Sequence, residues 1–257
     1  MRGVIEIELQ KFILIYIVLL IILFIMKKFK IKQEKLLLIA STRMSVQLII
    51  AGYILTYIME NPSPLFTMSY FAIMVIFAIY RTINKNPQMN RKFKMITALS
   101  IMLSGTSCAI FFIYIVIGES MFNPQYTIPI SGMLLGNAMN GTSLAIKSFY
   151  NLISGNSLQI KTLLNLGIHP EKILFPFLRD ALETAFIPTL NSMLGMGIVS
   201  LPGMMTGQIL SGTLPKVAIL YQISITLIIT TIVCVSCFGT LYFGQKTLWN
   251  KDAQINI

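Results

Sequence analysis

The stretch FILIYIVLLIILFIM, residues 12–26, contains no charged side chain, and the basic segment KKFKIKQEK follows it at residues 27–35. A helix that spans a membrane needs roughly 20 mostly apolar residues. A signal peptide has its basic residues before the apolar run and small residues after it, whereas this stretch has the reverse order. We therefore predict that it is a membrane helix that the mature protein retains.

The composition of the whole chain agrees with this interpretation. Of its 257 residues, 55% are hydrophobic and 11% are charged, whereas a soluble domain carries about 25% charged residues. The net charge of +11 would suggest nucleic acid in a soluble protein. Here the basic residues lie in short clusters between apolar runs, as in the loops of membrane proteins. We expect a protein surrounded by membrane lipid, with no nucleic-acid partner.

Six further apolar runs follow the first, at residues 36–59, 65–80, 95–117, 127–147, 181–199 and 216–243. We predict an all-α integral membrane protein with about seven transmembrane helices, forming a single permease domain over residues 1–257. A more polar stretch at residues 148–180 interrupts the series. The glycine-rich stretch at residues 201–212 could be a loop, a re-entrant turn or part of a helix.

Basic residues are distributed unevenly between the two sides of this seven-helix topology. If the loop at residues 27–35 is inside, the inside segments hold 16 lysines and arginines and the outside segments hold three, Arg2, Lys11 and Lys216. Cytoplasmic loops carry an excess of these residues. The count therefore predicts a multi-pass protein of the cell membrane with its N-terminus outside and its C-terminus in the cytoplasm.

The residues required for common kinds of catalysis and metal binding are scarce. His169 is the only histidine, and Cys108, Cys234 and Cys237 all fall within apolar runs. Cys234 and Cys237 have CxxC spacing, but a zinc site needs four ligands and there is no second pair. We expect membrane packing for the cysteines, no cofactor and no enzymatic activity. Any ATP would be hydrolysed by another chain.

Polar residues within the second apolar run would be costly in lipid. An arginine at a helix centre costs about 2.5–3.5 kcal/mol on insertion scales, and Arg43 lies about one-third of the way along this run. Gln47 is one helical turn further on, so both residues lie on the same helix face. Arg43 either faces the protein interior or extends to the membrane surface. We expect Gln47 to face the interior.

The fifth run combines small and polar residues. Gly132 and Gly136 are four residues apart, the spacing that lets membrane helices approach closely. Asn137 and Asn140 lie beside these glycines, and an amide without a partner costs several kcal/mol in an apolar environment. The asparagines either bond between helices or line a path for a transported substrate.

The stretch at residues 201–212 has similar features. Gly203 and Gly207 are again four residues apart, and Met204 and Met205 carry thioethers that suit soft metals or simple packing. The candidate residues of a transport path are Arg43, Gln47, Asn137, Met139, Asn140, Met204, Met205 and Gln208. The candidate helix-packing residues are Gly132, Gly136, Gly203 and Gly207.

Two copies of the chain facing each other could enclose a polar conduit. One chain of seven helices has few surfaces left for this purpose, and closed two-fold symmetry is the commonest arrangement of identical subunits. We therefore expect a homodimer of the permease.

The polar segment at about 150–178 is predicted to contact a partner in the cytoplasm. Ser157 can cap a helix that runs to about Leu166 and ends at Gly167, and Pro170 suits the first turn of the next helix. The residues expected to couple this segment to an ATPase are Leu163, Leu164, Leu166 and Gly167. Their leucines would form an apolar projection, which would have no use without a docking partner.

Several fragments of the chain resemble the FetB-type metal-export permeases. They are R43-x3-QL48, IPI-x-GM-x2-GNAM at residues 128–139, IPT at 187–189, LPGMMTG at 201–207 and YQI at 221–223. The fragments occur in the same order as in that family, and the resemblance covers about residues 36–245.

The resemblance implies the permease subunit of an ABC transporter that pairs with a separate cytoplasmic ATPase and, in bacteria, exports iron. Plant relatives are associated with aluminium tolerance and with nucleotide-sugar transport. We expect export of iron or a related metal. The alternatives are transport of an organic solute such as a nucleotide sugar, or a regulatory membrane scaffold.

The chain departs from the family pattern at two places. Asn191 stands where members often have aspartate, and Lys161 and Thr162 occupy a region where members often have an acidic residue. The first change weakens the prediction of a metal cargo if that aspartate serves a cation. The second implies an altered ATPase contact if the acidic residue takes part in docking.

Overall fold

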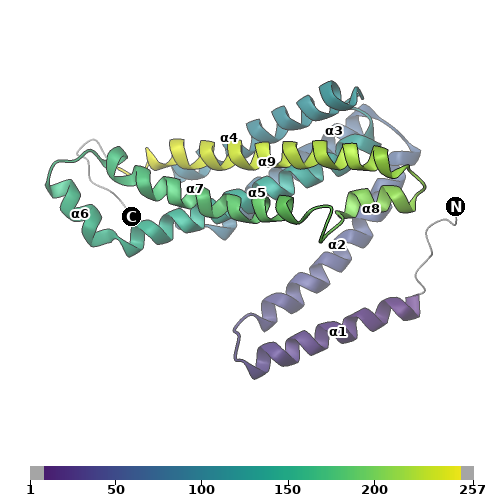
Figure 1. Cartoon of the computed structure of the whole chain (residues 1–257), viewed down its shortest axis with the longest axis horizontal. Coiled ribbons are helices and arrows are strands. Elements are labelled where there is room, and N and C mark those ends of the chain that lie inside the picture. Colours follow the sequence, from purple (N-terminus) through teal and green to yellow (C-terminus); the bar gives the residue numbers. More distant parts are fainter. Residues whose placement is uncertain (1–8, 250–257) are drawn as a thin grey trace.

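The computed structural model describes residues 9–249 and is helical over almost all of that range (Figure 1). Seven helices have 20 residues or more. They are α1 (Leu9–Lys28), α2 (Glu34–Glu60), α3 (Pro64–Lys85), α4 (Arg91–Ile110), α5 (Pro124–Gly155), α7 (Pro170–Gly195) and α9 (Pro215–Gln245). The short helices are α6 (Ser157–Asn165) and α8 (Gly203–Leu210), and a π-helix, η1 (Phe111–Ile117), continues α4. These elements correspond closely to the seven predicted apolar runs and the polar segment between them.

Four of these helices are long and apolar enough to cross a membrane by length and composition: α2, α3, α4 together with η1, and α9. The described chain is therefore that of an all-α integral membrane protein. The helices α1, α5 and α7 are not among the four, so the count of seven crossings stays a prediction.

Helix α5 lies at the centre of the helix bundle and packs against α3, α4, α7 and α9. Most of its length is buried, including the polar residues Thr127, Ser131 and Thr142. Thr142 and Ser236 of α9 form a hydroxyl hydrogen bond of 3.2 Å within this interface. A helix that is surrounded by protein rather than lipid can keep polar residues, which explains why α5 is less apolar than α9.

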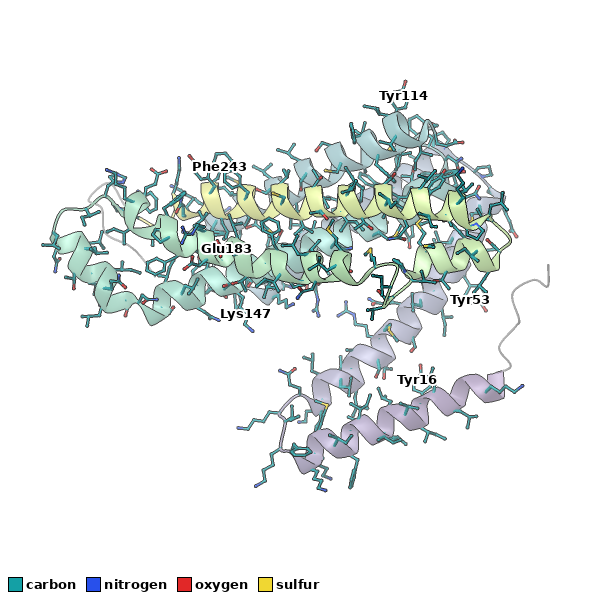
Figure 2. All side chains as sticks on the ribbon, viewed as in Figure 1. Tyr16, Tyr53, Tyr114, Lys147, Glu183 and Phe243 are labelled. Carbon is teal, nitrogen blue, oxygen red and sulfur yellow. The ribbon has the colours of Figure 1, made fainter. Side chains whose placement is uncertain are left out.

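Helices α1 and α2 form a hairpin that leans away from the other helices (Figure 1). Tyr16 of α1 points toward α2 and hydrogen-bonds to Ser45 (Figure 2). In α2 only Ile58, near the end of the helix, is buried. Nearly all of the apolar surface of α2 is thus left for lipid or for another chain.

The close helix contacts lie at glycines other than the predicted ones. A Cβ atom added at Gly136, Gly203 or Gly207 would meet no atom within 4 Å, and one at Gly132 would meet only Met74 Cε, at 3.4 Å. The spacing of four residues indicates a small-residue face but does not say which neighbour, if any, covers it. Within this chain, three of the four predicted packing glycines face open space.

The closest helix approaches involve α4, α5 and α9. A Cβ at Gly141 of α5 would lie 2.8 Å from Val233 Cγ1 of α9, and one at Gly244 of α9 would lie 2.6 Å from the Phe93 ring of α4. Gly105 of α4 is similarly constrained by Leu135 of α5, at 2.6 Å, and Gly239 by Ser100. None of these glycines has a second glycine four residues away, so the glycine pairs used as the sequence criterion did not include them.

One end of the bundle gathers the α3–α4 turn, α6 and the C-terminal end of α9 (Figure 1). The Asn90 side-chain amide donates to the Thr247 carbonyl at 2.8 Å, and Lys246 Nζ lies 3.5 Å from Glu171 Oε1. Leu248 is buried beside these contacts. The residues after α9 therefore tie α9 to the starts of α4 and α7.

Candidate functional site

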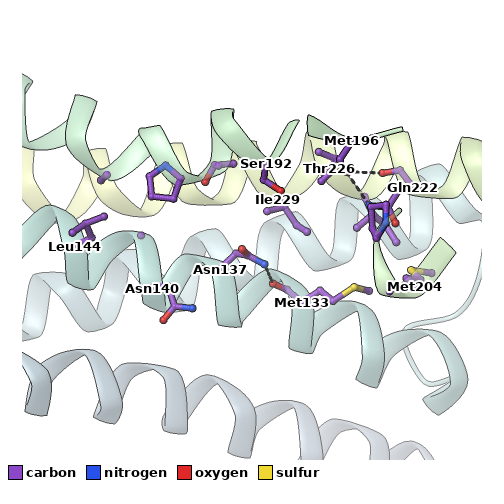
Figure 3. A pocket seen from close by; sticks show the side chains of 17 residues that line it. Met133, Asn137, Asn140, Leu144, Ser192, Met196, Met204, Gln222, Thr226 and Ile229 are labelled. Atoms are coloured by element: carbon purple, nitrogen blue, oxygen red, sulfur yellow. Dashed lines mark hydrogen bonds between the residues drawn. The ribbon is translucent and has the colours of Figure 1, made fainter. Parts of the chain in front are cut away.

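Helices α5, α7, α8 and α9 line an open cavity of about 410 Å³, called here the central chamber (Figure 3). Its polar groups are amides and hydroxyls, contributed by Asn137, Asn140, Thr189, Ser192, Gln222 and Thr226, and both asparagines are exposed. Its apolar lining includes the thioethers of Met133, Met196 and Met204 and the side chains of Leu144, Ile225 and Ile229. A cavity of this size can hold a small solute or a partly hydrated ion.

Helix α5 supplies one wall of the chamber because its polar residues share a face. Asn137 and Asn140 are three residues apart and therefore project from the same side of the helix. The Asn137 amide nitrogen donates to the Met133 carbonyl of its own helix at 2.8 Å. Its carbonyl oxygen makes no hydrogen bond among the described residues, so it is free to bond a ligand.

Pro188 shapes the opposite wall, in α7. Proline has no backbone N–H and cannot complete the helical hydrogen bond to the carbonyl four residues before it, at Thr184. Pro188, Thr189 and Ser192 all line the chamber. An interrupted helix beside a polar cavity is tolerated in a membrane protein because protein and water, rather than lipid, surround it.

The segment between α7 and α8 closes the chamber at one end. Gly197 has a φ of +85°, which favours glycine, and its N–H bonds to the Ser200 carbonyl at 2.9 Å. Pro202 then precedes α8, which brings Met204 to the chamber. The stretch at residues 201–212, which the sequence allowed to be a loop, a re-entrant turn or part of a helix, is thus a short helix with turns on both sides.

Helix α9 supplies residues that the sequence analysis did not select. The Gln222 amide nitrogen lies 3.1 Å from Thr226 Oγ1, and that hydroxyl lies 3.5 Å from Sδ of Met196, the residue after α7. In the sequence, Gln222 was noted only within the YQI fragment that resembles the family. Thr226, Met196 and Ser192 were not among the candidate path residues. Gln222 and Thr226 are four residues apart in an apolar run, so their shared face was the signal that could have identified them.

The chamber carries no charged side chain. Among the described residues, no group of three or more histidines, cysteines, aspartates or glutamates is placed to hold a metal ion. The C-terminal end of α7, with a partial negative charge, and the N-terminal end of α8, with a partial positive charge, both adjoin the cavity. The lining therefore offers hydrogen bonds and thioether sulfur without a net charge.

The structure separates the α2 candidates from the chamber. Gln47 lies in a different groove between α2, α3 and α5, together with Gly132, Gly136 and Met139. Arg43 is exposed on the outer surface of α2. On α5, Gly132, Gly136 and Met139 each precede a chamber residue by one position, which turns them about 100° away from it. Asn137, Asn140 and Met204 are the path candidates that line the chamber.

Met205 and Gln208 take other positions. Met205 is 9% exposed and lines a second cavity of about 520 Å³ between α7, α8 and α9. The side-chain oxygen of Gln208 is buried and has no hydrogen-bond partner among the described residues. Asn191, which departs from the family pattern, is exposed on α7 and is not part of the chamber lining.

The predicted helix is present as α6, and of the three leucines predicted to form its apolar projection only Leu166 is exposed. Gly167 has a φ of +78° and follows the end of α6, as predicted. Leu163 and Leu164 are partly buried against the core, because they face inward from α6. Leu166 is 71% exposed, and Leu158 at the start of the helix is 79% exposed. The exposed projection is therefore formed by Leu158 and Leu166.

A bundle of apolar helices around a neutral polar chamber defines a membrane protein of permease-like architecture. The family model described as "Uncharacterised protein family (UPF0014)" matches residues 9–249, and the chain belongs to this family. The predicted resemblance to the FetB-type permeases is confirmed, since a member of this type is among its relatives.

Three relatives show how far the similarity extends. The UPF0014 membrane protein YjkA of Bacillus subtilis (strain 168) is 33% identical over 237 residues, 92% of this chain and 93% of the relative. The "Probable iron export permease protein FetB" of Escherichia coli (strain K12) is 32% identical over 230 residues, 89% and 87% of the two chains. The protein ALUMINUM SENSITIVE 3 of Arabidopsis thaliana is 31% identical over 214 residues, 83% and 77%. No solved structure matches the chain.

Proposed function

We propose that this protein is the membrane-spanning permease subunit of an ABC transporter and that the central chamber lies on its transport path. The observation that carries the proposal is the chamber itself, a cavity to which α5, α7 and α9 contribute amides and hydroxyls within a bundle of apolar helices. Polar groups at membrane depth occur where they face protein or a water-filled path.

The pattern of hydrogen bonds favours a path over simple helix packing. If the polar residues only joined helices, they would bond across the interface. Asn137 instead bonds to its own helix, and the side chains of Asn140, Thr189 and Ser192 form no hydrogen bond among residues 9–249. Their capacity to bond is thus left for water or a solute.

The cargo proposed from the family resemblance is iron or a related metal, and a separate cytoplasmic ATPase supplies the energy. Its docking surface would be the segment at about 150–178. An organic solute is the second candidate, because the chamber offers neutral hydrogen-bonding groups. A nucleotide sugar fits less well, since its phosphates would find no lysine or arginine in the lining. A regulatory scaffold would not need such a chamber.

A homodimer remains part of the proposal. The open glycine face at Gly132 and Gly136 lies in a groove with Gln47, and α2 is almost entirely exposed. A second copy could cover these surfaces and extend the polar path. The helix-packing role proposed for Gly136 and Gly207 would then be a contact between copies, whereas Gly203 lines the central chamber.

We also propose seven membrane crossings with the N-terminus outside. In intact cells a membrane-impermeant thiol reagent should label a single cysteine at Ser120, between η1 and α5, and should label one at Gln159, in α6, only after the membrane is permeabilised. Labelling of both positions from outside would contradict the topology. The termini themselves, including the counted residues Arg2 and Lys251, lie outside the described range.

The transport function is tested by deleting the gene and measuring growth and cell content across a panel of metals. Loss of an exporter should lower the tolerated concentration of its cargo and raise the amount of that metal in the cell, and the wild-type gene should restore both. An unchanged response to every metal, combined with a changed content of an organic solute, would favour the second candidate.

A further inference from the structure

The central chamber and the second cavity share a wall that contains a methionine. Met196, Gln222 and Thr226 line both cavities. Figure 3 shows these three side chains close together, with dashed lines marking their hydrogen bonds. A solute that moved from one cavity to the other would have to pass Met196, at the point where α7 ends.

Further methionines lie on both sides of this wall. Met133 and Met204 line the central chamber, and Met193 and Met205 line the second cavity. The Thr230 hydroxyl lies 3.3 Å from Met193 Sδ, and the Thr226 hydroxyl lies 3.5 Å from Met196 Sδ. Each of these hydroxyls also lies within hydrogen-bond distance of a backbone carbonyl of its own helix, 2.8 Å from Gln222 O for Thr226 and 2.9 Å from Thr226 O for Thr230. Two of the thioether sulfurs thus lie beside polar groups of the shared wall.

The chemistry of this lining selects a class of cargo. Hard cations such as Mg²⁺ or Ca²⁺ require carboxylate or other anionic oxygen ligands, and neither cavity contains a carboxylate. Thioether sulfur is a soft ligand that selects Cu(I) over harder ions. A neutral site also disfavours multiply charged ions, because their charge would stay uncompensated at membrane depth.

We propose that the two cavities form a relay of thioethers for a soft monovalent cation, Cu(I), which is handed from Met133 and Met204 through Met196 to Met193 and Met205. Amide oxygens of Asn137 and Gln222 would supply weaker neutral ligands along the way. The proposal rests on the transport role proposed above and names Cu(I), in place of iron, as the metal that this lining favours. It concerns the binding of the ion and can be tested without transport.

The test is a Cu(I) competition experiment on the purified full-length protein in detergent with ascorbate, using the chromophoric chelator bicinchoninate. All proteins carry Cys234→Ser, which removes the exposed thiol. The parent protein should withdraw Cu(I) from the chelator, and Met196→Leu should weaken the binding by about tenfold or more, as expected for a lost ligand. Leucine has nearly the volume of methionine, so the fold should be kept.

Met102→Leu is the matched control, because Met102 lies on the exposed face of α4 and lines neither cavity. It should bind Cu(I) as the parent does. The proposal is overturned if the parent does not compete with the chelator, if Met102→Leu lowers the affinity as much as Met196→Leu, or if excess Fe(II) displaces the bound Cu(I).

The Cu(I) competition, the gene deletion and the transport assay together separate the two proposals. If Cu(I) binding depends on Met196 while deletion of the gene changes the content of no metal or solute, the binding site stands and the transport role fails. If Asn137→Leu abolishes transport of another cargo while the parent fails to bind Cu(I), the transport role stands and the relay is wrong.

Discussion

Replacing Asn137 with leucine should reduce export by about tenfold or more, while the amount of the protein in the membrane stays the same. Asn137 projects into the central chamber, where its side-chain oxygen is free to bond a solute. Loss of a hydrogen bond to a charged group costs about 1.5–3 kcal/mol, and each 1.4 kcal/mol corresponds to about a factor of ten. Leucine has a similar size, so helix packing should change little. The measurement is cargo efflux from cells that express each variant, normalised to its membrane abundance.

The control for this prediction is Asn191→Leu, the same substitution at an exposed position of α7 outside the chamber. It should leave export per molecule unchanged. If Asn137→Leu lowers membrane abundance and leaves export per molecule intact, the chamber residue is structural and the transport path lies elsewhere.

Replacing Leu166 with aspartate should release the ATPase from the permease and thereby stop ATP-driven transport. Leu158, at the start of α6, and Leu166, directly after its end, are both exposed apolar residues. An apolar anchor of a protein interface contributes about 2 kcal/mol or more, which corresponds to about 30-fold in affinity, and a buried carboxylate would cost more. We expect the affinity-tagged permease to lose an ATP-hydrolysing ABC subunit that co-purifies with the wild type.

Two variants make this experiment specific. Leu214→Asp adds the same charge at an exposed leucine before α9, at the opposite end of the bundle, and should retain the ATPase. Leu164→Asp should instead lower the amount of folded permease, because Leu164 packs against the core. Full co-purification with Leu166→Asp would rule out this surface as the docking site.

The course of the chain was predictable because lipid imposes strong rules. Apolar runs about 20 residues long have few structural alternatives, and Gly167 and Pro170 mark the end of α6 and the start of α7 as their backbone preferences require. Six of the seven apolar runs therefore lie within the observed helices, with η1 counted as part of α4, whereas the run at residues 181–199 extends four residues beyond the end of α7 at Gly195.

The site was predictable only in part. Asn137, Asn140 and Met204 were found because polar or unusual residues in an apolar run are conspicuous. Their partners on α7 and α9 were missed, since Ser192 and Thr226 resemble the many serines and threonines that bond to their own helix. Gln47 lies in a separate groove with Gly132 and Gly136. Its place on the path stays a prediction, because a single sequence does not tell which faces of α2 and α5 meet.

The contacts of α9 also have a consequence for how the protein is made. Helices α4 and α5 pack extensively against α9, and the residues that follow α9 bond to Asn90 and Glu171. During synthesis, α9 leaves the ribosome after α4 and α5. Until it enters the membrane, the Thr142 hydroxyl of α5 lacks Ser236, its bonding partner. This buried pair therefore forms only once α9 is inserted, so the bundle is completed by a helix that is made later than the helices it packs against.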